Sequence, residues 1–477
     1  MPVSARLRSW VVSVRALDWA RPASGIFVFW ASGLAILGFS IAWWLLSFDR
    51  HFQRPDVGFY QGVGEAVARG LVPYRDFDPV YPPASLPVFA LPSLLGAEPG
   101  RWETYALRFE HLMLLVGWLA VLAVVFALVA LGSSRRRMAI ALAFMAISPV
   151  LVGATIVARY DLWPAALATA SLGAVIAGRE RLGSAGMGLS IMAKVYPIVV
   201  VPLVLAYVWR RAGTRAAMAA GLSTVVGAAL GAMPYLVMAP GGMLASLTDF
   251  MSRPLQVESA GAAILWTAHI VAGVPISVVA GFGSDNLVGP LPSAVITLMS
   301  VVLALALGAV WVGFARRRAP RGEDLALAAA TAICAFVLFG KVLSGQYLIW
   351  LIPAVALLRG PRGVSAALIL GGALVLTQQW YPARYPAWVY GLDDSVAWVV
   401  LARDLTLGAL LVTLAAPTGW AAEVRGWLGR VTGRPSIPTM RPATLGGAPV
   451  AVQPAFNAIR PEPIRVEPAE AMSEAWE

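Results

Sequence analysis

Charged residues are scarce in this chain of 477 residues, where they make up 13% of the sequence, about half of the share that soluble domains usually carry. Hydrophobic residues account for 59%, and the mean hydropathy is +0.74. Together these values exclude a soluble globular protein. Cysteine is almost absent too: the single one, Cys334, lies in an apolar run, which excludes a disulfide framework and a pair of thiols.

Lysine is the third scarce feature. Of 36 basic side chains only two are lysines, Lys194 and Lys341, and both occur inside apolar sequence. An ammonium group is a compact charge that suits a phosphate, whereas the guanidinium of arginine is a wide planar fork. We therefore predict that both lysines bind a phosphate. The alternative for each is a lysine at a helix end whose ammonium reaches the membrane surface.

Long apolar runs are what the sequence does contain, and many approach the ~20 residues that a helix needs to cross a bilayer. They cover residues 25–48, 106–131, 138–157, 161–178, 213–238, 290–314, 324–341, 342–358, 364–380 and 396–416. The short alternating strands of a membrane barrel are missing from the pattern. The sequence thus predicts an all-α polytopic membrane protein with about nine to twelve transmembrane or re-entrant helices.

Arginine clusters at the ends of the apolar runs indicate an orientation. The net charge of +11 comes from clusters such as residues 135–137 and 316–318, which alternate with apolar runs as orientation signals do. This distribution argues against nucleic-acid binding. It predicts a multi-pass protein of the cytoplasmic (inner) membrane with its N-terminus inside and a long first extracytoplasmic loop, residues 49–105.

The membrane domain is expected to cover residues 25–416. Residues 1–24 are predicted to form a cytoplasmic segment. Residues 417–477 are rich in proline and in charges of both signs and show no apolar period, so we predict a disordered cytoplasmic tail. The first apolar run ends in bulky residues, unlike a cleaved signal peptide, and we expect it to be retained.

Two regions of the membrane domain do not fit simple spanning. Region 184–209 has arginine signals on both flanks and contains Tyr196-Pro197 in its middle, which predicts a re-entrant hairpin with its break at that proline. Region 239–289 is predicted to be extracytoplasmic, with 262–280 lying on or dipping into the outer face of the membrane.

The first extracytoplasmic loop contains Asp56, followed four residues later by Tyr60. A carboxylate at the membrane surface, partly removed from water, has the tunable basicity to deprotonate a sugar hydroxyl. Asp56 is therefore the predicted general base, with Tyr60 as a substrate contact one helical turn away. The alternative is that Asp56 only caps the start of a helix over residues 57–69, and the two roles are compatible.

Farther along this loop stand Arg75, Asp76, Asp78 and Tyr81, which we expect to contact substrate. The spacing of Asp76 and Asp78 occurs in sugar-transfer enzymes that bind a divalent cation. Two carboxylates alone are a weak signal for a metal, and Arg75 can neutralise the pair. We therefore predict neither a metal nor another cofactor.

Polar residues elsewhere on the same predicted side complete the candidate site. Arg159 and Asp161 either hold a hydroxyl or close a helix turn. The other candidates for binding the sugar and head group are Tyr196, Gln256, Glu258, His269, Gln346 and Tyr347, with Arg253 as a further cation for the phosphate. His111 is interpreted as interfacial, and Arg403-Asp404 as a buried pair that neutralises itself.

Several of these residues stand in motifs. These are Asp56-x-x-x-Tyr60, Gly70-x-x-Pro-Tyr-Arg-Asp-Phe77, Tyr81-Pro-Pro83, Ala193-Lys-Val-Tyr-Pro197, Leu255-Gln-Val-Glu-Ser259 and Lys341-Val-Leu-Ser-Gly-Gln-Tyr-Leu-Ile-Trp350. In this order, over residues 25–416, the chain resembles glycosyltransferase family 87 of the GT-C class, whose known members include polyprenol-phosphate-mannose-dependent mannosyltransferases. Gly345 departs from the proline that the family often has there.

The resemblance implies an inverting transfer of a sugar from a polyprenyl-phosphate donor, in the first place mannose, to a lipid-linked or glycan acceptor. It implies that an acidic residue of the first outer loop is the base, the position of Asp56. The residues agree, since nucleotide sugars are normally unavailable outside and an external site needs a donor that arrives through the bilayer. Two alternatives are a transporter or lipid flippase, which also uses broken helices and buried charge, and a catalytically inactive scaffold.

Overall fold

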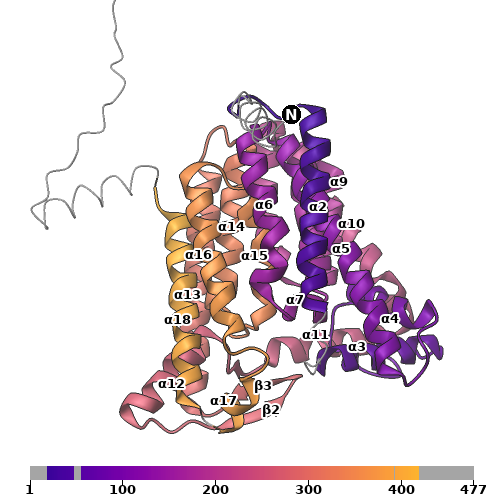
Figure 1. The fold of residues 1–477 in the computed structure, drawn as a ribbon, viewed down its shortest axis with the longest axis vertical. Helices are drawn as coiled ribbons and strands as arrows, with labels where there is room; N and C mark the ends of the chain where they lie inside the picture. Colours follow the sequence, from indigo (N-terminus) through magenta and orange to yellow (C-terminus); the bar gives the residue numbers. More distant parts are fainter. Residues whose placement is uncertain (1–18, 48–54, 392, 418–477) are drawn as a thin grey trace, which may run out of the picture. The chain divides into compact units, whose positions relative to one another are not determined.

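A computed structural model describes residues 19–47, 55–391 and 393–417, and these residues are predominantly helical (Figure 1). Within them, seven helical segments are long and apolar enough to cross a membrane. They are α2 (Gly25–Ser47), α5 (Trp102–Ala130), η2 (Tyr196–Val200) with α10 (Val201–Met238), α13 (Pro290–Ala315), α14 (Gly322–Phe339), α16 (Gly360–Gln378) and α18 (Asp394–Ala415). This confirms the prediction of an all-α polytopic membrane protein. Most of the predicted N-terminal segment and tail lies outside the described residues.

The arginine clusters meet at one end of the helices, here called the arginine end. Arg137 and Arg359 both pair with Glu323, at 2.9 and 2.6 Å, and so join three turns of the chain. Arg210 donates to the carbonyl oxygen of Ala315 and ties α10 to the end of α13. The arginine clusters that we interpret as orientation signals therefore lie together in space.

Short elements gather at the opposite end, here called the loop end (Figure 1). They are α3 (Pro55–Ala68), η1 (Pro83–Ser85), α4 (Leu86–Leu94), α11 (Pro240–Ser252), α12 (Ala260–Ala272), α17 (Tyr385–Gly391) and a sheet of β1 (Leu255–Gln256), β2 (Val278–Gly281) and β3 (Ser284–Leu287). The strands are antiparallel in the order β1-β3-β2, with Gln256 opposite Asn286. This sheet brings residues 255–258 beside residues 284–287.

The predicted spans at 138–157 and 161–178 are interrupted near the loop end. The structure has α6 (Arg135–Val152), the single turn α7 (Thr155–Ala158) and α8 (Leu162–Ile176). Gly153 ends α6 at φ 70°, a left-handed conformation that glycine adopts without strain. The break leaves residues 159–161 outside regular helix, and two of them become part of the site described below.

Region 184–209 contains a reversal of the chain. Helix α9 (Glu180–Ala193) ends before Lys194, and the chain returns through η2 and the first part of α10. A second reversal follows at Gly213 (φ 83°), where Leu205 and Gly221 lie opposite each other on the two segments of α10. Lys194 thus stands at a helix end and not in the middle of a span.

The predicted span 342–358 is instead a short buried segment made of η3 (Gly345–Trp350) and α15 (Leu351–Ala356). All six residues of α15 are buried. A 12-residue segment is too short to cross a bilayer by itself. It forms part of the core, and its first turn carries residues 345–350 to the site.

Close packing between α9 and α10 gives a test of the fold. A methyl group on Gly227 would lie 1.8 Å from the carbonyl oxygen of Ala185, whereas one on Gly221 would come no closer than 3.8 Å to Leu205. We expect Gly227→Ala to lower the unfolding free energy by about 1–3 kcal/mol, because the two backbones must separate. Gly221→Ala should be neutral or stabilising, since alanine favours helix. Thermal unfolding in detergent compares the two, and equal midpoints would contradict this packing.

Candidate active site

A cavity of about 690 Å³ lies at the loop end and collects most of the polar residues predicted from the sequence. Its polar lining comes from the start of α3, residues 80–82 before η1, the α7–α8 break, the turn after α9, the segment around β1, β3, the segment after α14 and the segment around α17. The predicted residues in the lining are Asp56, Tyr81, Arg159, Lys194, Tyr196, Arg253, Gln256, Glu258, Lys341, Gln346 and Tyr347.

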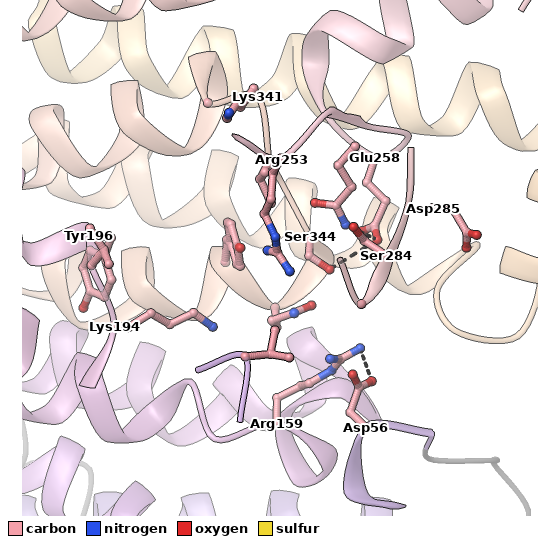
Figure 2. Close-up of a pocket in the computed structure, with 18 of the residues that line it drawn as sticks. Asp56, Arg159, Lys194, Tyr196, Arg253, Glu258, Ser284, Asp285, Lys341 and Ser344 are labelled. Atoms are coloured by element: carbon pink, nitrogen blue, oxygen red, sulfur yellow. Dashed lines mark hydrogen bonds and ion pairs between the residues drawn. The ribbon is translucent and has the colours of Figure 1, made fainter. Parts of the chain in front are cut away.

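Asp56 lies in the first turn of α3, and its carboxylate faces Arg159 across the cavity wall (Figure 2). Their closest atoms, Asp56 Oδ2 and Arg159 Nη2, are 2.5 Å apart. Arg159 is buried and also donates to the hydroxyl of Tyr381. The carboxylate of Asp56 keeps 27% of its side chain exposed, so it is held by a fixed cation and still reachable from the cavity.

Lys194 stands among aromatic rings. Its Nζ lies 4.7 Å from the ring centre of Tyr160, 5.0 Å from that of Tyr347 and 5.1 Å from that of Trp350. Such rings attract a cation with their negative faces. Its counterion is Asp161, 2.6 Å away.

Asp161 does not line the cavity, although it was predicted to contact substrate. It is fully buried behind Lys194 and accepts a second hydrogen bond from Trp350 Nε1 at 2.7 Å. Asp161 is only two residues from Arg159 in the sequence, but the two side chains contact different partners. Asp161 therefore fixes the position of Lys194 and does not reach the cavity itself.

Arg253 and Lys341 bring further positive charge to the cavity. In Figure 2 the guanidinium of Arg253 points into the space between Lys194 and Arg159. It also donates to the carbonyl oxygen of Phe282. Lys341 lies farther from Lys194 in this view, and its Nζ donates to the carbonyl oxygen of Met251 at 2.6 Å. Lys194, Arg253 and Lys341 thus lie on one side of the cavity (Figure 2).

Glu258 is a buried carboxylate on the other side. It accepts hydrogen bonds from Gly345 N at 2.9 Å, Ser344 Oγ at 3.2 Å and Gln256 Nε2 at 3.1 Å. Burial raises the pKa of Glu258 to about 7, an effect that Arg403 and the Gly345 amide oppose. This group therefore changes charge near neutral pH.

The raised pKa of Glu258 predicts a pH-dependent stability. The folded protein keeps this proton up to about pH 7, whereas the unfolded chain releases it near the ordinary pKa of 4.5. Stability relative to Glu258→Gln should therefore fall by roughly 3 kcal/mol as pH rises from 4.5 through 7, and then level off. Melting midpoints at pH 5, 6, 7 and 8 test this. Glu103→Gln, at an exposed site, is the control. Parallel curves for wild type and Glu258→Gln would refute the assignment.

Other predicted contacts lie away from the cavity lining. Tyr60 is buried in an aromatic cluster, with its ring stacked on Phe89 at 4.3 Å between centroids. His269 belongs to α12, where its Nδ1 donates to the carbonyl oxygen of Val274 at 2.7 Å. Neither residue lines the cavity.

The Asp-x-Asp pair of the first loop is also outside the lining. Asp76 pairs with exposed Arg75 at 2.9 Å and accepts from the backbone nitrogen of Val72. Asp78 accepts from the backbone nitrogen of Val80. These bonds shape the loop. In the part of the chain that the structure describes, no group of three or more acidic, histidine or cysteine residues is arranged to hold a metal ion.

Sequence reasoning missed an aromatic and acidic part of the cavity. Asp285, Tyr381, Tyr385 and Tyr390 line it, together with Trp350 near Lys194. The tyrosines lie in α17 or just before it. In the sequence they resemble the aromatic residues that are frequent at membrane surfaces. Their spacing in Tyr381-Pro-Ala-Arg-Tyr385 was a signal that could have been used.

The cavity also has an apolar wall. Leu303 of α13 and Phe336 and Phe339 of α14 contribute to it. Both helices are among the candidate membrane spans. The polar site therefore borders two of the helices that are long and apolar enough to cross a membrane.

The chain is a multi-pass membrane protein with a polar cavity that holds a carboxylate, several cations and an apolar wall. The model of glycosyltransferase family 87 matches residues 80–345, more than half of the chain. The chain therefore belongs to glycosyltransferase family 87 and is a membrane glycosyltransferase with sugar donor and acceptor substrates. No curated protein matches it.

Proposed function

We propose that this glycosyltransferase has a GT-C-type mechanism and transfers a sugar, in the first place mannose, from a polyprenyl-phosphate donor to a lipid-linked or glycan acceptor, with inversion. The observation that carries the proposal is the cavity in which Asp56 shares one space with Lys194 and Arg253, with an apolar wall that comes from two candidate membrane spans. In a lipid-phosphate sugar, the phosphate matches the two cations, the lipid chain matches the apolar wall, and the sugar is the group that reacts near the carboxylate.

The proposed orientation follows from the two ends of the helices. Arginine-rich turns favour the cytoplasmic side, so the arginine end and the N-terminus are assigned to the inside of the cytoplasmic membrane. The loop end, with residues 49–105 and 239–289, then faces outward. Nucleotide sugars are normally unavailable there. A donor carried by membrane lipid is consistent with this orientation.

The proposed reaction needs a bound phosphate and a base. Lys194, Arg253 and Lys341 bind the donor phosphate and stabilise the charge it gains on leaving. The acceptor oxygen forms a bond to the anomeric carbon from the face opposite the phosphate. The bond from that carbon to the phosphate oxygen breaks, and the leaving polyprenyl phosphate keeps the electron pair. Asp56 takes the proton of the acceptor hydroxyl. The charge stabilisation comes from side chains, so no metal or other cofactor is proposed.

The remaining lining residues have proposed supporting roles. Arg159 holds Asp56 at the cavity wall. When substrate binds, one carboxylate oxygen of Asp56 turns from Arg159 to the acceptor hydroxyl. Tyr196 and Tyr347 stack on Trp350 and so support the rings around Lys194. Gln256, Glu258 and Gln346 bind sugar hydroxyls. A sugar with several hydroxyls can use both acceptors and donors in this set.

The test is a transfer assay with the purified protein in lipid nanodiscs. It receives polyprenyl-phosphate mannose, glucose or N-acetylglucosamine, together with a membrane lipid extract as the source of acceptor. We expect a new glycosylated lipid or glycan from one of these donors, identified by mass spectrometry, and an anomeric configuration opposite to that of the donor, identified by NMR. Product formed only from a nucleotide sugar, or vesicle transport without any covalent product, would reject the proposal.

A further inference from the structure

Apart from Arg159, which pairs with Asp56, the charged residues of the cavity lie on separate sides according to their charge. Figure 2 shows Lys194, Arg253 and Lys341 on one side and Glu258 with Asp285 on the other. A donor phosphate is attracted to the first side and repelled by the second. The acidic side can therefore bind a different part of the substrates, and the proposed function gives Glu258 a role with sugar hydroxyls but gives Asp285 none.

Asp285 is held in a specific arrangement at the end of this acidic side. It lies in β3, and only 7% of it is exposed. Tyr385 donates to its Oδ2 at 2.9 Å, and Tyr390 donates to both carboxylate oxygens at 3.0 and 3.1 Å. Tyr390 is itself 67% exposed, although it lines the cavity. A carboxylate oriented by two phenols thus lies beneath an exposed aromatic ring.

This arrangement is connected to the proposed base. The ring of Tyr385 meets that of Tyr381 edge to face, with centroids 5.8 Å apart. Tyr381 accepts a hydrogen bond from Arg159, which pairs with Asp56. A molecule bound over Tyr385 and Asp285 therefore extends along one continuous wall toward the carboxylate that must receive its proton.

The chemistry of the wall selects its ligand. The faces of a sugar ring present C–H groups that pack on aromatic rings, and sugar hydroxyls donate to carboxylate oxygens. An anionic group there would face the carboxylate of Asp285, which two phenols already orient. Like charges at short distance disfavour binding.

We propose that Asp285, Tyr385 and Tyr390 form the acceptor subsite of the enzyme and that it binds an uncharged hexose unit. This inference rests on the proposed function and adds the chemical class of the acceptor. Asp285 accepts hydrogen bonds from the hydroxyls of that hexose, and the rings of Tyr385 and Tyr390 pack on its face. The cationic side of the cavity remains for the donor.

The test measures KM for donor and acceptor separately. The donor is polyprenyl-phosphate mannose, and the acceptors are octyl mannoside, which is uncharged, and octyl mannoside 6-phosphate. Asp285→Asn and Tyr390→Phe should raise the KM for octyl mannoside about tenfold or more, because each removes hydrogen bonds to the sugar or the phenol that orients the carboxylate. The KM for the donor should change less than about twofold. Asp249→Asn, at an exposed position of α11 outside the cavity lining, is the matched control.

The outcomes separate the two levels of the proposal. Lack of transfer by the wild-type enzyme from any polyprenyl-phosphate sugar, with lipid extract as acceptor, rejects the proposed function. Transfer by the wild type with an unchanged acceptor KM in Asp285→Asn leaves that function standing and rejects the subsite. An equal rise of both KM values with a lowered melting temperature shows a structural clamp, which also rejects it. Preference of the wild type for the phosphorylated acceptor rejects the assignment to an uncharged hexose.

Discussion

Replacement of Asp56 by asparagine is expected to lower kcat for glycosyl transfer by about 10³-fold, because an amide cannot take up the acceptor proton, a step that contributes roughly 10²–10⁴-fold. The amide keeps the shape of the carboxylate and its place in the first turn of α3. The KM for the donor should change little, since the donor phosphate contacts other residues in the proposed scheme. Asp56→Glu retains an acid, displaced by one methylene, and should keep part of the activity. Initial rates with labelled polyprenyl-phosphate mannose measure these effects.

The ion pair with Arg159 requires a control for folding. Asp56→Asn leaves the buried Arg159 with Tyr381 but without its carboxylate partner at 2.5 Å, which costs stability. Melting temperature and membrane insertion are therefore compared with those of Asp249→Asn, an exposed aspartate of the loop end. A folded Asp56→Asn protein with activity within about tenfold of wild type would exclude Asp56 as a general base that contributes the usual 10²–10⁴-fold.

The helices could be predicted from the sequence because each apolar run has a length that the bilayer sets. The predicted run 213–238 even begins at Gly213, where the structure reverses direction. Composition could not separate residues 342–358 from a true span, since a helix buried among helices is as apolar as one in lipid. The three-stranded sheet was also missed, because strands of two to four residues are too short to show an alternating period.

The candidate site could be predicted in part, for an energetic reason. Lys194 and Lys341 stand in apolar sequence, where an unused charge is too costly to keep, and both line one cavity. Side-chain direction was not predictable from spacing. Arg159 reaches the cavity wall, whereas Asp161, two residues later, turns behind Lys194.

The acidic and aromatic wall required the structure. Asp285 follows Ser284 in a loop-like sequence that resembles ordinary solvated chain, and its partner tyrosines come 100 and 105 residues later in the sequence. Only the pairing of β1 with β3 brings Asp285 beside Gln256 and Glu258. Tertiary contacts of this range leave no trace in local sequence patterns.

Replacement of Lys194 by methionine is expected to lower kcat/KM for the donor by about 10²–10³-fold, the loss typical when one group that stabilises transition-state charge is removed. Methionine fills a similar volume among the rings of Tyr160, Tyr347 and Trp350 but carries no charge. Lys194→Arg should restore little, since a planar guanidinium does not fit the space of a compact ammonium. Steady-state kinetics with varied polyprenyl-phosphate mannose measure both variants.

The double variant Lys194→Met with Asp161→Asn separates phosphate binding from structural support. The single variant leaves Asp161 buried without its cation, which costs about 3–5 kcal/mol of stability. The double variant removes both charges, and the asparagine oxygen can still accept from Trp350 Nε1. Melting temperature should therefore recover in the double variant while activity stays low, because the phosphate still lacks its ammonium partner. Recovery of activity together with melting temperature would show that Lys194 serves only to neutralise Asp161.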